Sequence, residues 1–130
     1  MRASSRKLAA LLATRLDEIL PPSLSARAEG PRLSIFAGGE AQGGSAAAVL
    51  VEDEDDELDA RIETAVRAML SGVQDCVIRH LGEPWPESGR QGALPMPGAR
   101  VEQGLVHLWF GDEHAPDVRL TPFERSRLME

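Results

Sequence analysis

The sequence has no asparagine and no tyrosine, a single cysteine, a single lysine and no long apolar run. Since Cys76 stands alone, an intramolecular disulfide is excluded, as suits a reducing cytoplasm. No apolar stretch approaches the ~18 residues that a membrane-spanning helix needs. The missing asparagine, the thirteen arginines and the abundant Ala, Gly and Pro are typical of a GC-rich bacterial genome. We therefore expect a bacterial, cytoplasmic protein.

The charge balance is acidic, with 14 basic and 21 acidic residues, a net charge of −7 and a pI near 5.0. This balance argues against binding to nucleic acid or to an anionic membrane, because both need clustered Lys and Arg. Arg2, Arg6 and Lys7 followed by LAALLA faintly resemble a targeting segment. The apolar run is short, and TRLDE follows where a cleavage site would lie, so we expect no signal peptide.

The length suits one domain, residues 1–130, and the pattern in the first 82 residues is clear. Apolar residues at three- and four-residue spacing predict a helix that Ser4 or Ser5 caps and that Pro21-Pro22 ends. A second helix of about 24 residues, capped by Gly82, follows from the same period. Between the helices we expect strands at 24–29 and 32–37, a flexible loop at 38–45 and an apolar strand at 46–51.

The last third of the chain predicts a long loop followed by a hairpin. Residues 83–98 contain four prolines and three glycines and show no period. We expect strands at 99–102 and 105–110, a loop at 111–116, a short strand at 117–120 and a helical tail starting at Thr121-Pro122. The order α-β-β-β-α-β-β(-β)-α predicts an α+β fold, with a mainly antiparallel sheet and two long helices packed on one face.

Two segments resemble ligand-binding loops but fail on their spacing. GGEAQGGS at 38–45 has Gly44 where a phosphate-binding loop needs lysine, and a predicted strand follows instead of a helix. The acidic run Glu52–Asp59 would place Leu58 and Thr64 at the glycine and glutamate positions of a calcium loop. Acidic residues at a helix start complement the helix dipole, and a cationic partner stays open as an alternative.

Residues 107–114, HLWFGDEH, hold two histidines and two acidic residues within eight positions. His107 or His114 with Asp112 or Glu113 would suit acid–base catalysis, and the same atoms suit a metal. The competing interpretation is a strand end and its turn, because Gly111-Asp112 is ordinary turn chemistry. We expect no catalytic residue, metal or cofactor, and we keep as an alternative a small enzyme or metal-binding domain built on His107, Asp112 and His114.

Cys76 and His80 form a second candidate pair, four residues apart on one face of the long helix. That spacing can ligate zinc, but two ligands do not make a zinc site. We expect Cys76 to be a packed apolar side chain.

The two tryptophans give a different signal. Trp85 is held between Pro84 and Pro86, and Trp109 lies on the less apolar face of its strand with Leu105 and His107. Either tryptophan packs against its own chain or anchors a partner, because aromatic residues dominate interface hot spots. The predicted partner-binding residues are therefore Trp85, Leu105, His107 and Trp109, and the predicted cover is a second copy, a partner peptide or the proline-rich loop.

The element order, small size and acidity resemble the type III secretion chaperone-like fold, which includes YbjN-type domains. VQDCVIRHLGEPWP and LVHLWFGDEHAP also resemble stretches of small actinobacterial proteins with no assigned activity. The resemblance to the chaperone-like fold is one of topology, covers most of the chain and transfers no functional residue; the 83–98 loop departs from it. It implies a homodimer that binds other proteins without catalysis, as a chaperone or an adaptor.

Overall fold

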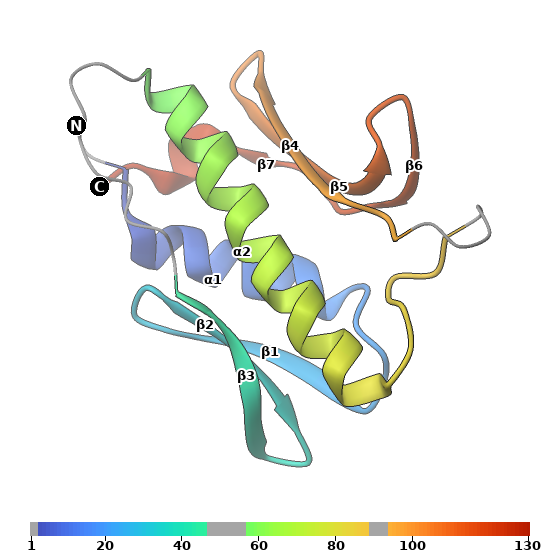
Figure 1. Cartoon of the computed structure of the whole chain (residues 1–130). Helices are drawn as coiled ribbons and strands as arrows, with labels where there is room; N and C mark the ends of the chain where they lie inside the picture. Colours follow the sequence, from blue (N-terminus) through green and yellow to red (C-terminus); the bar gives the residue numbers. More distant parts are fainter. Residues whose placement is uncertain (1–2, 47–56, 89–93) are drawn as a thin grey trace.

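The computed structural model describes residues 3–46, 57–88 and 94–130 (Figure 1). In chain order the elements are α1 (Ser5–Asp17), β1 (Leu24–Glu29), β2 (Arg32–Ala37), β3 (Glu40–Ala46), α2 (Leu58–Leu81), β4 (Pro97–Glu102), β5 (Leu105–Asp112), β6 (Ala115–Arg119), β7 (Phe123–Glu124) and the 3₁₀ turn Arg125–Leu128. The expected α+β class and element order are confirmed.

The strands form two antiparallel sheets rather than the single sheet that we expected. Within the described ranges, one sheet has the order β1-β2-β3, and the other has the order β4-β5-β6 with β7 also paired to β5. α1 packs on β1 and β2, whereas α2 contacts β3 and β4 and so bridges both sheets (Figure 1). A 24-residue helix is about 36 Å long, more than the width of one three-stranded sheet. The helix is therefore long enough to pack on two separate sheets, a division of the strands that their sequence pattern alone did not reveal.

Both helices begin and end near the predicted positions. The Ser4 hydroxyl accepts from the Lys7 N–H at 3.3 Å, and Leu8, Leu12 and Leu16 are fully buried. Gly82 ends α2 in the left-handed conformation, with φ 72°. Neither helix is long and apolar enough to span a membrane. One hydrophobic cluster includes side chains from both helices and both sheets.

The predicted loop at 38–45 is wrong, since Glu40–Ala46 forms β3. Gly38 and Gly39 both have positive φ, 59° and 88°, as a two-residue hairpin turn requires. Gly44 lies so close to β2 that an added Cβ would stand 2.1 Å from the Leu33 carbonyl oxygen. This strand therefore forms through backbone pairing at closely approaching glycines. It lacks the alternation of apolar residues by which a strand is usually recognised in a sequence. The predicted strand at 46–51 lies outside the described residues, apart from Ala46.

The C-terminal expectations need two corrections. The loop predicted at 111–116 is a tight turn, because β5 extends to Asp112 and β6 begins at Ala115. The tail is not helical from Thr121: its hydroxyl donates to Glu18 Oε2 at 3.0 Å. Phe123 instead pairs with Val106 in β7 and is buried in the core, so helix begins only with the 3₁₀ turn at Arg125.

Candidate functional site

The candidate site is the outer face of the second sheet, the face that points away from the helices. Val106, Leu108 and Phe110 alternate inward along β5 and are fully buried. Leu105, His107 and Trp109 lie on the opposite face, as predicted, where their neighbours on β4 are Glu102, Arg100 and Gly98. Leu105 and His107 are half-buried.

Trp109 is covered by its own chain and is 9% exposed. It stands opposite Gly98, and a Cβ added to Gly98 would lie 2.4 Å from the indole Cε2 and Nε1. Only glycine at this position leaves room for the ring. Trp109 is thus a largely covered residue of the outer face, and it is not exposed enough to anchor a partner.

Trp85 is also buried, at 7% exposure, and packs edge-to-face on Phe110 with ring centroids 5.6 Å apart. The buried Gln74 on α2 holds the proline-rich segment on both sides of the undescribed residues 89–93. Its Nε2 donates to the Trp85 carbonyl at 3.3 Å and to the Pro95 carbonyl at 2.6 Å. The structure therefore places Trp85 in the core, and of the four predicted partner-binding residues it leaves Leu105 and His107 half-exposed.

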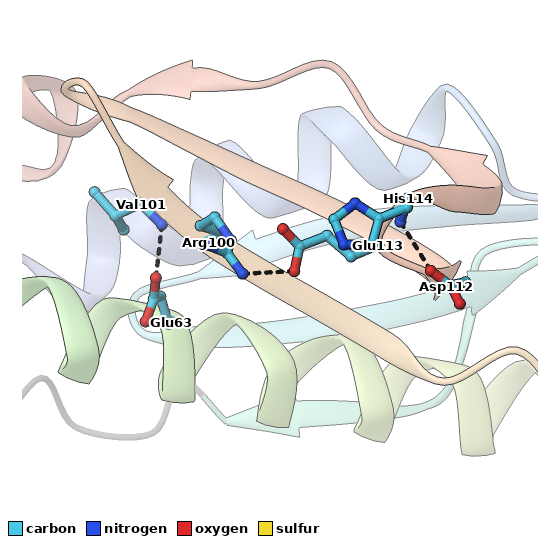
Figure 2. Close-up of polar contacts among 6 residues, drawn as sticks. All are labelled: Glu63, Arg100, Val101, Asp112, Glu113 and His114. Atoms are coloured by element: carbon cyan, nitrogen blue, oxygen red, sulfur yellow. Dashed lines mark hydrogen bonds and ion pairs between the residues drawn. The ribbon is translucent and has the colours of Figure 1, made fainter.

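The ionisable groups of 107–114 are separated by the strand and its turn. The Asp112 carboxylate accepts from the His114 backbone N–H at 2.9 Å, and Glu113 pairs with Arg100 at 2.7 Å (Figure 2). His107 is five residues from Asp112 on the same strand, roughly 16 Å at about 3.3 Å per residue. Among the described residues, no three His, Cys, Asp or Glu side chains are placed to hold a metal ion.

The Cys76–His80 pair is likewise not arranged as a site. Cys76 is 2% exposed and lies against Gly43, whereas His80 is exposed at the end of α2. Burial raises the pKa of the Cys76 thiol, and the charge of Arg79 offsets part of that rise. A buried thiol with a raised pKa is a poor nucleophile and a poor ligand.

A shallow pocket of about 190 Å³, which we name the trough, crosses the outer face. It is lined by Arg100, Glu102, His107, Leu108, Trp109, Glu113, Arg119 and Leu120. The hydrogen bond and charge of Glu113 raise the pKa of Arg100, with further contributions from the charges of Glu102 and Glu63. Sites for drug-sized ligands usually enclose ~300–1,000 Å³, so the trough suits a side chain better than a whole small molecule.

Sequence reasoning missed the exposed apolar residues of this face. Leu94 is 42% exposed and Met96 is 65% exposed, and they are the large apolar side chains that stand out to solvent in the described part of the chain. They border a second pocket of about 270 Å³ beside the β5–β6 turn, and the Met96 carbonyl accepts from the Gly111 N–H at 2.8 Å. The signal was their position between prolines, where no helical or strand period gives an apolar residue a face to bury.

Comparison of the chain with protein-family models, with curated proteins and with solved structures gives no match. The resemblance to the type III secretion chaperone-like fold therefore stays a prediction. What the residues of this face can do has to be argued from their own geometry.

Proposed function

We propose that this protein is a non-enzymatic, cytoplasmic protein-binding module, an adaptor or chaperone-like protein that works as a homodimer. Its binding surface is the outer face of the second sheet. The observation that carries the proposal is the pair of exposed apolar side chains, Leu94 and Met96, at one end of that face. We name Leu94, Met96 and the 270 Å³ pocket that they border the apolar end.

Exposed apolar side chains gathered beside a pocket are typical of surfaces that bind protein. Methionine in particular adapts its shape to different apolar partners, because its side chain is unbranched and polarisable. The pocket at the apolar end is also lined by the small residues Gly111 and Ala115 and by two acidic residues, Asp112 and Asp117. A partner segment with an apolar anchor and a neighbouring basic residue fits this arrangement.

The other classes of ligand are less well supported. A net charge of −7 opposes nucleic acid, and the trough and the pocket at the apolar end, at about 190 and 270 Å³, are both smaller than sites for drug-sized ligands. The alternative of an enzyme or metal-binding domain needs His107, Asp112 and His114 together, whereas Asp112 is bonded within its own turn.

The proposal is tested by selecting peptides from a displayed random library on the immobilised full-length protein. We expect peptides with an apolar anchor, and at least tenfold weaker binding of the same peptides to the Leu94→Ser/Met96→Ser variant. Both residues are exposed, so this variant keeps its core. The matched control is Arg27→Ser/Phe36→Ser on the first sheet, which should bind like the wild type. Equal binding by the Leu94/Met96 variant, or a library that yields no binder, would contradict the proposal.

A further inference from the structure

Two charged side chains of the trough are not engaged in a hydrogen bond or ion pair within the described residues. Arg119 and Glu102 are exposed, and neither makes a hydrogen bond or ion pair with another residue in the part of the chain that the structure describes. The other two charges of the trough, Arg100 and Glu113, are bonded to each other at 2.7 Å. The trough therefore presents one positive and one negative charge outside any described hydrogen bond or ion pair, and we call these the uncommitted charges; Glu102 acts on Arg100 only through its charge.

The two uncommitted charges lie at opposite corners of the sheet. Glu102 pairs in register with Leu105, and Arg119 pairs with Trp109, four residues further along β5. Four residues of strand are roughly 13 Å, and β4 and β6 lie on opposite sides of β5. The two side chains are too far apart to neutralise each other within one chain, but each has its complement on any second copy.

We propose that the trough is the surface on which two copies of this chain associate, with Arg119 of each copy bonded to Glu102 of the other. This inference rests on the proposed homodimer and names its interface. A two-fold axis that crosses the trough midway between the two corners, perpendicular to the line joining them, places both pairs at once. Such an isologous interface uses the same patch on both copies, as a closed dimer requires.

The charge distribution favours this face for self-association. The four charged side chains of the trough sum to zero, two basic and two acidic, so the remainder of the chain carries the full −7. Because the trough is neutral overall, two troughs can meet without net repulsion and with opposite charges facing each other. The half-buried His107 lies between the two corners, and the largely covered Trp109 lies at the Arg119 corner.

The size of the face sets the strength that we expect. Three strands about 5 Å apart and about eight residues long cover on the order of 400 Å². A stable interface usually buries about 800 Å² on each partner, so the dimer should be weak, with a dissociation constant in the micromolar range or above. The apolar end shares no lining residue with the trough.

The test is sedimentation equilibrium of the full-length chain over a wide concentration range, with charge reversals. Arg119→Glu changes the net charge from −7 to −9 and should weaken association at least tenfold. Glu102→Arg changes the net charge from −7 to −5 and should also weaken association. If only the repulsion between net charges mattered, this smaller net charge would instead strengthen association. The double variant Arg119→Glu/Glu102→Arg should recover most of the wild-type association.

The matched controls are Arg32→Glu and Glu29→Arg, the same charge changes at exposed positions beside the β1–β2 turn of the first sheet. Each should shift the dissociation constant by less than about threefold. A wild type that stays monomeric at every concentration, an Arg119→Glu variant no weaker than Arg32→Glu, or a double variant without recovery would overturn the inference. None of these results alters the peptide-binding test, because that test probes the apolar end.

Discussion

The two sheets share a plan and differ on their outer faces. Each is antiparallel with three main strands, and each has an edge N–H capped by a helix carboxylate: Asp17 accepts from Ala26 at 2.7 Å, and Glu63 accepts from Val101 at 2.8 Å (Figure 2). These caps occupy donors that would otherwise invite another strand. Because the two sheets are built alike, the fold can be stable without any difference between their outer faces.

On the outer face of the first sheet, the Phe36 ring is covered by a side chain of the same sheet. The Arg27 guanidinium lies 4.9 Å from the centre of the Phe36 ring, and the neighbouring Ser34 is 7% exposed. The second sheet instead has the trough and the exposed Met96. Because the two sheets are otherwise alike, we propose the second sheet, rather than the first, as the interaction surface.

The largest effect that we expect comes from glycine in each sheet. Gly98→Val should destabilise the protein by about 3 kcal/mol, because the new side chain displaces the Trp109 ring from its buried position. Gly44→Val should destabilise it similarly, through a clash with the Leu33 carbonyl. Urea denaturation measures both. In a Trp85→Phe background only Gly98→Val should shift the tryptophan emission to the red, and an unshifted spectrum would show that Trp109 is not held against Gly98.

The next effect concerns the buried amide of Gln74. Gln74→Leu should lower the free energy of unfolding by about 2 kcal/mol, because the carbonyls of Trp85 and Pro95 lose their donor. Gln42→Leu is the matched control in the first sheet, since its amide donates to the Glu40 carbonyl in an exposed position. Hydrogen exchange at residues 84–88 should accelerate only in the Gln74 variant, and equal exchange in the two variants would contradict its anchoring role.

The edge caps should have smaller and nearly additive effects. We expect Glu63→Ala to lower stability by about 1 kcal/mol, and Asp17→Ala by somewhat less because Asp17 is more exposed. The double variant should show the sum, since the two caps serve different sheets. Chemical denaturation of the three variants tests whether the edges are closed alike. If one substitution has no effect, the two sheets are not equivalent at their edges.

The smallest effect belongs to the surface ion pairs. Glu113→Gln should change stability by no more than about 0.5 kcal/mol, because the Arg100 and Glu113 side chains are 53% and 35% exposed. Asp59→Asn, at a pair that is 41% and 39% exposed, should behave alike. Both effects should shrink in 1 M salt. A loss several times larger for Glu113→Gln would show that the pair organises the trough beyond its own charge.

The sequence predicts the helices better than the sheets. α2 was predicted at its observed bounds because a sustained apolar period and Gly82 mark them. The β4–β5 hairpin was predicted because Gln103-Gly104 suits a two-residue turn, and both residues have positive φ. β3 was missed because its pairing rests on glycines, and the division into two sheets because it depends on how one long helix packs.

The site was predicted in part. Strand alternation correctly placed Leu105, His107 and Trp109 on one face, but it gives no information on what covers that face. The cover of Trp109 depends on Gly98, which the pattern could only assign to a loop. The exposure of Leu94 and Met96 follows from how Gln74 holds Pro95, a contact across 21 residues of chain that no local pattern contains.

The most direct test of the outer face of the second sheet as the interaction surface is an amide chemical-shift map of the isotope-labelled protein over a dilution series. We predict concentration-dependent shifts in β4, β5 and β6, centred on Arg100, His107 and Arg119, with β1, β2 and β3 unchanged. Shifts centred on the first sheet, or no shift anywhere up to millimolar concentration, would contradict the account.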